Sequence, residues 1–186
     1  EKLKIYENKN QICDVFFSMS HGVNRGKLKR DKEDERHNFI TNLITQCPNI
    51  IFDIYGYKNR EPVWAEDFYK VIVNSKMALN LTRGKPLKYL TSNRIASLIG
   101  NGLLTFIDRR TKLDNFFNKN EVIFYSSLQD LAEKINQFKA NDKARMKIAK
   151  NGRKKYFELF ECQKISDYII SKSFNRENSK RLKWMD

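Results

Sequence analysis

The sequence has few of the residues that mark fibrous, disulfide-linked or membrane-spanning proteins. Its 186 residues include only 7 Gly and 3 Pro, which excludes a collagen-like chain and a flexible Gly/Ser linker. The three cysteines, Cys13, Cys47 and Cys162, stand far apart without a CxxC pair, so the sequence predicts neither a disulfide framework nor a zinc site. Apolar runs fall far short of the roughly 20 residues that span a bilayer. Because the chain begins EKLKIYENKN, without an initiator Met or an apolar leader, we expect a piece of a longer protein.

A strong excess of positive charge is present instead, together with enough large apolar side chains for a core. There are 36 Lys and Arg against 22 Asp and Glu, giving a net charge of +14, and 13 Phe and 8 Tyr supply apolar volume. Residues 143–186 alone hold 13 basic residues and 5 acids. A stretch of this kind can contact a nucleic acid, an anionic membrane surface or only water. The distribution predicts a basic tail at residues 175–186.

Short apolar runs alternate with amphipathic segments along the chain. The runs predict strands at residues 15–19, 50–55, 77–81, 103–107 and 122–125. The amphipathic segments predict helices at 33–46, 65–75 and 92–99, a fourth capped by Ser127, and two more near 142–160 and 163–173. Strands that alternate with helices form a parallel sheet covered on both faces. The sequence therefore predicts an α/β domain over residues 1–174, a doubly wound, Rossmann-like parallel sheet of about five strands.

Basic and glycine-containing loops follow the predicted strands. In a doubly wound sheet, ligands bind at the carboxyl ends of the strands, so these loops are the candidate site. Glycine lets a ligand approach the backbone, and a helix N-terminus beside Arg or Lys suits a diphosphate. The alternative is that these side chains are ordinary solvated loop residues. The candidates for a diphosphate are Gly22, Arg25, Lys27, Arg83, Ser92, Asn93 and Arg94.

Several motifs of other chemistries are missing. The first strand is not followed by GxGxxG, and neither GxxxxGK[ST] nor GxSxG occurs, which argues against dinucleotide binding, a P-loop ATPase and a serine hydrolase. The acidic run at residues 31–35 is best explained as favourable charge at a helix N-terminus, and we predict no metal site there.

The order of segments after Ser75 resembles the donor-binding, C-terminal half of group 1 glycosyltransferases of the GT-B class. Four segments carry the resemblance: SKMALNLTR at 75–83, TSNRIASLIGNGLLTFIDRR at 91–110, NEVIFYSSLQDLAEKINQF at 120–138 and KARMKIAKNGRKKYFELF at 143–160. One departure stands out, because the family often has an acid shortly after the helix-opening Arg, whereas Ile95-Ala96-Ser97 follows Arg94 here.

The resemblance implies a domain that binds a nucleotide-sugar for transfer to a glycan or lipid-linked acceptor in polysaccharide biosynthesis. It implies that Arg25, Lys27 and Arg94, with Arg83, offset the charge of the diphosphate without a metal or another cofactor. The acceptor domain and the general base would lie on an N-terminal half outside this chain, so the catalytic residues are unknown and the chain alone is expected to be inactive. A cytoplasmic location, peripheral at the inner face of the membrane, is the expected setting. The resemblance also places Tyr55 and Gly56 near the nucleotide.

Two other functions remain open at this stage. The charge and the aromatic content are compatible with a nucleic-acid-binding module, although the aromatic residues fall at periodic, core-forming positions and no RNA-recognition signature is present. A non-catalytic α/β scaffold domain is the second alternative. We expect no specific nucleic-acid partner.

Overall fold

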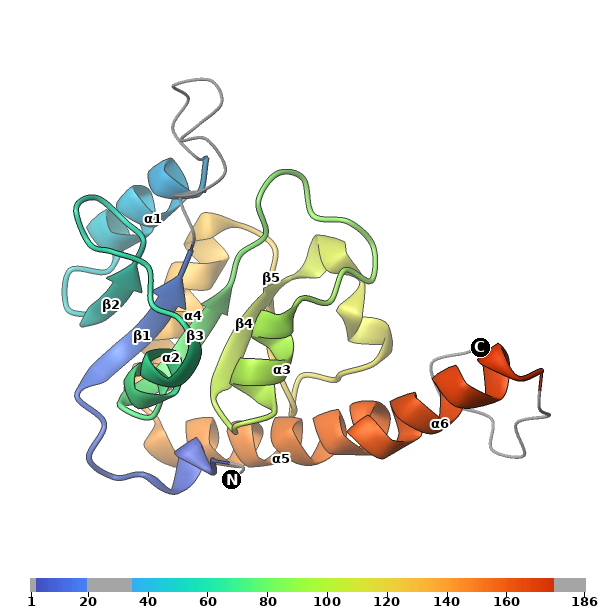
Figure 1. Ribbon diagram of the computed structural model, residues 1–186. Coiled ribbons are helices and arrows are strands. Elements are labelled where there is room, and N and C mark those ends of the chain that lie inside the picture. The colour runs from blue at the N-terminus through green and yellow to red at the C-terminus, as the bar shows by residue number, and fades with distance from the viewer. Residues whose placement is uncertain (1–2, 20–34, 176–186) are drawn as a thin grey trace.

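The computed structural model describes residues 3–19 and 35–175, and its centre is a five-stranded parallel sheet (Figure 1). The strands are β1 (Cys13–Ser18), β2 (Phe52–Tyr55), β3 (Ser75–Asn80), β4 (Leu104–Asp108) and β5 (Ile123–Tyr125). Their order across the sheet is β2-β1-β3-β4-β5, and every neighbouring pair is parallel. This confirms the predicted doubly wound α/β fold of about five strands.

Helices cover both faces of the sheet. On one face lie α1 (Glu35–Gln46) and α4 (Leu128–Lys139), and on the other lie α2 (Ala65–Ile72) and α3 (Asn93–Ile99). The long helix α5 (Asp142–Phe160) runs along the amino ends of the strands, and α6 (Cys162–Ser173) extends away from the sheet without burying a residue (Figure 1). Three short 3-10 turns complete the described part: η1 (Ile5–Glu7), η2 (Arg109–Thr111) and η3 (Leu113–Asn115).

Alternation along each strand divides the core between the two faces. In β1, Val15 and Phe17 pack towards α1 and α4, whereas Phe16 packs towards α2 and α3. All six residues of β1 are buried, because a central parallel strand has helices on both sides. The continuous apolar run that predicted this strand therefore reflects its central position.

The element boundaries differ slightly from those predicted. The helix expected to reach Ser75 ends at Ile72, because Ser75 already pairs with Cys13 as the first residue of β3. The turn η1 was not predicted; its Ile5 is buried, and its backbone N–H donates to the carbonyl of Asn101. The predicted cap of α4 is present, since the hydroxyl of Ser127 accepts from the N–H of Asp130 at 3.1 Å.

A buried carboxylate joins three parts of the fold near the start of β1. Asp14 is 1% exposed and accepts from the N–H of Ile51 at 3.0 Å. The ammonium groups of Lys76 and Lys139 each lie 2.9 Å from it. Burial alone would raise the pKa of Asp14, but the Ile51 N–H and the two lysines outweigh burial and lower it below its ordinary value.

We expect Asp14→Asn to lower the free energy of unfolding by about 1–3 kcal/mol at pH 7, because two lysines lose their shared anion. A lowered pKa means that Asp14 stabilises the fold above the pKa of the unfolded chain, and that this contribution fades as pH falls through the folded-state pKa. Urea unfolding of the wild type and of Asp14→Asn between pH 3 and 7 should therefore show a difference in free energy of unfolding that becomes smaller as the pH falls. A constant difference would contradict this role.

Candidate functional site

The topology places a switch point between β1 and β3. Along the sheet, β2 lies beside β1 on one side and β4 lies beside β3 on the other, so the strand order reverses between β1 and β3 (Figure 1). Ser18 and Asn80 are the last residues of these two strands. Because Phe16 pairs with Ala78 two residues earlier, Ser18 and Asn80 lie side by side on the α2/α3 face.

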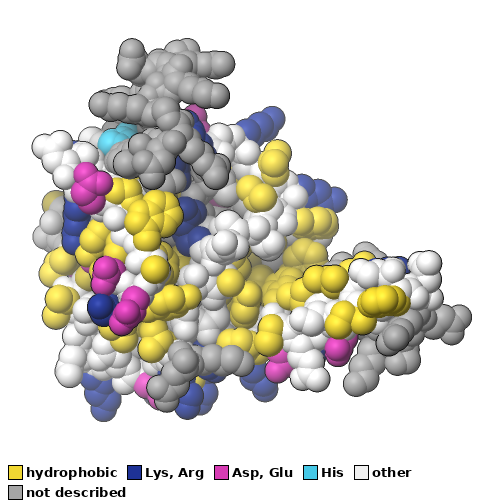
Figure 2. All heavy atoms as spheres, viewed as in Figure 1, with side chains coloured by type: hydrophobic (Ala, Val, Ile, Leu, Met, Phe, Trp, Pro, Cys, Tyr) yellow, Lys and Arg dark blue, Asp and Glu magenta, His cyan; other side chains and the backbone are white. Residues whose placement is uncertain are grey.

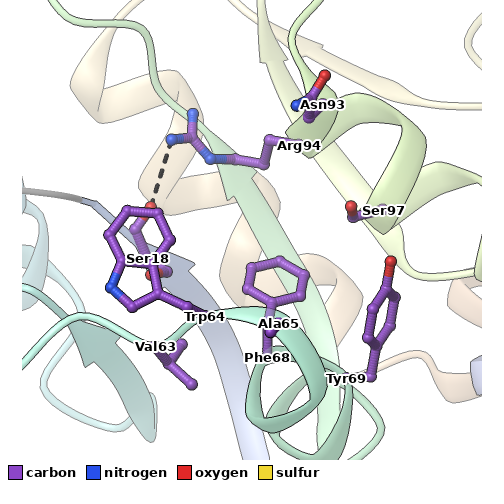
Figure 3. Close-up of a pocket in the computed structure, with 9 residues that line it drawn as sticks. All are labelled: Ser18, Val63, Trp64, Ala65, Phe68, Tyr69, Asn93, Arg94 and Ser97. Carbon is purple, nitrogen blue, oxygen red and sulfur yellow. Dashed lines mark hydrogen bonds between the residues drawn. The ribbon is translucent and has the colours of Figure 1, made fainter.

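Arg94 bridges the two strand ends at this point. Its side chain rises from the start of α3 and donates to the carbonyl of Leu81 at 2.7 Å and to the carbonyl of Ser18 at 3.3 Å (Figure 3). Its guanidinium carbon lies 5.0 Å from the centre of the Phe17 ring. Within residues 3–19 and 35–175, no carboxylate forms an ion pair with Arg94.

Partial burial makes the charged form of Arg94 energetically unfavourable. Desolvation by burial lowers the pKa of Arg94 to about 10, and the positive charge of Arg36 on α1 lowers this pKa further. Arg36 is itself 7% exposed. Arg94 remains charged at neutral pH, so the switch point holds a positive charge that backbone carbonyls only partly compensate. Such a charge favours an anionic ligand.

A pocket of about 330 Å³ opens beside Arg94, between the beginnings of α2 and α3 (Figure 3). Trp64, which is 63% exposed, and the rings of Phe68 and Tyr69 form its aromatic side. Its polar side is lined by Ser18, Asn93, Arg94 and Ser97. We call this the aromatic pocket. Ser97 contributes a hydroxyl to this pocket. The resembled family often has an acid shortly after the helix-opening Arg, and residues 95–97 contain no acid here.

A second pocket of about 250 Å³ lies at the same end of the sheet, beside α1, and we call it the polar pocket. Asp108 and Arg110 form a two-pronged ion pair in its wall, with Arg110 Nε 3.0 Å from Asp108 Oδ1 and a terminal nitrogen 2.6 Å from Oδ2. Burial, followed by the charge of Asp108, raises the pKa of the neighbouring Tyr125, which stays neutral and able to donate a hydrogen bond. The remaining lining residues are Glu35, Arg36, Phe39, Leu81, Thr82, Gly84 and Pro86.

The sequence-predicted candidates on α3 are only partly brought to the site. Asn93 and Arg94 line the aromatic pocket, whereas Ser92 and Arg83 are exposed and line neither pocket. Ser92 precedes α3, but its hydroxyl makes no capping hydrogen bond. With seven residues, α3 offers less than two turns of aligned peptide dipoles, so positive charge at the site comes from side chains.

The candidates on the loops after β1 and β2 have other surroundings. Gly22, Arg25 and Lys27 lie outside the described residues. The Tyr55 ring packs against Phe16, at 6.1 Å between centres, and under the guanidinium of Arg60, at 3.7 Å. Gly56, with φ +70°, lies against the backbone of Met19. Neither Tyr55 nor Gly56 lines a pocket named above.

The site also includes residues that the predicted set did not contain, among them Ser18, Arg36 and Trp64. These residues come together only through the order of the strands in the sheet, which local sequence patterns do not predict. A polar residue that ends an apolar strand was the one signal in the sequence, and it applied to both Ser18 and Asn80.

The fold and the site define a class of protein, a doubly wound α/β domain with a cationic crevice at its switch point. A comparison with family models matches residues 32–171 to the glycosyl transferase-like family, and the chain belongs to that family. A search among curated proteins gave no match. No helix in the described part of the chain is long and apolar enough to cross a membrane. Residues 3–19 and 35–175 contain no cluster of His, Cys, Asp or Glu suited to a metal ion.

Proposed function

We propose that this chain is the nucleotide-sugar-binding domain of a GT-B glycosyltransferase. The observation that carries the proposal is the guanidinium of Arg94. It is a half-buried cation at the switch point, and its hydrogen-bond partners in the described residues are two backbone carbonyls. A diphosphate supplies the missing negative charge, and Arg binds phosphate oxygens through several N–H groups at once. Membership of the glycosyl transferase-like family supports a nucleotide-linked sugar as the bearer of that diphosphate.

The two pockets suit the two ends of such a ligand. Arg94 contacts Ser18, which lines the aromatic pocket, and Leu81, which lines the polar pocket. The rings of Trp64 and Phe68 offer stacking surface for a nucleoside. Asp108 and Tyr125 offer the acceptor and donor groups that a hydroxyl-rich sugar needs. The diphosphate then lies between them, at Arg94.

In the reaction that we propose, the chain's side chains act on the leaving group. As the bond between the sugar and the diphosphate breaks, negative charge grows on the diphosphate, and the fixed positive charge of Arg94 stabilises it without a metal. Within the proposal, the acceptor and the general base belong to a second domain. The proposed acceptor is a glycan or a lipid-linked sugar at an anionic membrane surface. The basic tail at residues 175–186, of which 176–186 lie outside the described residues, assists that contact.

A nucleoside diphosphate should stabilise this chain against thermal unfolding. At 100 times its dissociation constant, ligand linkage contributes about 2.7 kcal/mol, a rise of roughly 5–10 °C in melting temperature for a domain of this size. The measurement is a thermal-shift panel of UDP, GDP, CDP and ADP, each with and without a chelator. We expect one base to stand out and the chelator to change nothing. A folded sample that shows no shift with any diphosphate at millimolar concentration would refute the proposed function.

A further inference from the structure

The side-chain amide of Asn80 is the one feature of the switch point that the fold does not explain. Asn80 is 2% exposed at the carboxyl end of β3, and neither its Nδ2 nor its Oδ1 has a hydrogen-bond partner among residues 3–19 and 35–175. Buried polar groups are nearly always paired, because an unpaired one loses its hydration without a replacement. Here both the donor and the acceptor are unpaired at once.

The position of this amide connects it to the aromatic pocket. Strand alternation directs Asn80 to the α2/α3 face, next to Ser18, which lines that pocket. The guanidinium of Arg94 lies across the same two strand ends, bound to the carbonyls of Ser18 and Leu81. The amide thus lies one strand away from Ser18, behind the wall of the aromatic pocket, and is not itself part of the pocket lining. A ligand that contacts the amide therefore has to enter past Ser18.

A nearby polar residue shows that the unpaired amide is not a general feature of this face. Thr105 in β4 is fully buried and pairs with Ala78 across the sheet, two residues before Asn80. Its hydroxyl donates to the carbonyl of Leu103 at 2.9 Å. The fold thus satisfies the buried polar side chain of Thr105 and leaves the buried amide of Asn80, at the strand end, unsatisfied.

We propose that Asn80 is a ligand-binding residue that recognises a ribose hydroxyl of the nucleotide, next to the diphosphate at Arg94. A hydroxyl both donates and accepts, and so it satisfies Oδ1 and Nδ2 together, whereas a phosphate oxygen satisfies only the donor. Stacking of the base in the aromatic pocket and a diphosphate at Arg94 leave the ribose between them, above Ser18 and Asn80. This inference rests on the proposed function and adds the group by which the site distinguishes one nucleotide from another.

The test combines stability with binding. Without ligand, Asn80→Leu should raise the melting temperature by about 2–4 °C, because an apolar side chain of similar size replaces an unpaired buried amide. The same substitution should weaken the nucleoside diphosphate identified by thermal shift about tenfold or more in calorimetry. The matched control is Thr105→Val, which removes a satisfied hydroxyl from the same face and should leave the dissociation constant unchanged.

Binding of deoxynucleotides shows which ribose hydroxyl Asn80 contacts. Either the 2′-deoxy or the 3′-deoxy form of that diphosphate should bind wild type at least tenfold more weakly, and should bind Asn80→Leu as well as the ribose form does. Equal binding of all three forms to wild type would overturn the inference while leaving the proposed function standing. So would an Asn80→Leu protein that is less stable and binds normally, because the amide would then serve the fold. Absence of binding by any diphosphate to wild type would refute both.

Discussion

Replacement of Arg94 by Met should weaken the binding of a nucleoside diphosphate by about 30-fold or more and change the melting temperature by only a few degrees. Removal of one partner from a buried charged contact costs about 2–5 kcal/mol in binding. Stability changes less, because two effects oppose each other. The carbonyls of Ser18 and Leu81 lose a donor, while a half-buried cation with no carboxylate partner in the described residues is also removed.

The chain provides a matched control for this substitution. Arg153 on α5 also donates to a backbone carbonyl, that of Leu3 at 3.3 Å, and its guanidinium carbon also lies 5.0 Å from a ring centre, that of Phe157. It lies on the helix that runs along the amino ends of the strands (Figure 1). Arg153→Met should therefore leave the affinity unchanged. Calorimetric titration of both variants measures the contrast, and equal losses of affinity would argue against a diphosphate at Arg94.

The surface around the site combines exposed apolar and basic side chains. Figure 2 shows hydrophobic and basic side chains close together on the side of the molecule where the loop between β3 and α3 lies in Figure 1. In that loop, Leu87 and Leu90 are exposed apolar residues, and Lys85 and Lys88 are exposed cations. This surface borders the polar pocket, because Thr82, Gly84 and Pro86 of the same loop line that pocket.

The sequence predicted the fold well because the fold depends on local patterns. The apolar run from Val15 to Phe17 and the cap at Ser127 each determine a strand or a helix through interactions within a few residues. Parallel pairing followed from alternation of strands and helices, since such strands need a crossover. The family resemblance is confirmed by the match over residues 32–171.

The site was less predictable, because its residues meet only through the strand order. Ser18, Asn80 and Arg94 come from three separate segments, and up to 76 positions separate the two ends of one hydrogen bond. No local pattern indicated that the Asn80 amide would lose its hydration without gaining a hydrogen-bond partner in the described residues. Loop composition indicated basic candidates, but it did not distinguish the half-buried Arg94 from the exposed Arg83.

Gly56 was predicted to lie near the nucleotide, and the structure gives it a second role that a substitution can separate from the first. We expect Gly56→Ala to lower the free energy of unfolding by about 3–5 kcal/mol. A Cβ at this position would stand 1.7 Å from the carbonyl oxygen of Met19, a backbone atom that cannot move without disturbing the end of β1. The φ of +70° adds the strain that an L-residue meets in the left-handed region.

Substitution of Gly84 is a control that measures the backbone strain of a positive φ without the steric clash found at Gly56. It has φ +75°, but the nearest atom to its Cβ would be a Glu35 carboxylate oxygen at 3.8 Å, an ordinary contact. Gly84→Ala should therefore cost only about 1 kcal/mol, the strain without the clash. Urea unfolding followed by circular dichroism measures both values. Equal losses would mean that the chain around Met19 relaxes freely. A Gly56→Ala protein with normal stability and no affinity for a nucleoside diphosphate would instead assign Gly56 to the ligand, because only the ligand would then require the space that its missing side chain leaves.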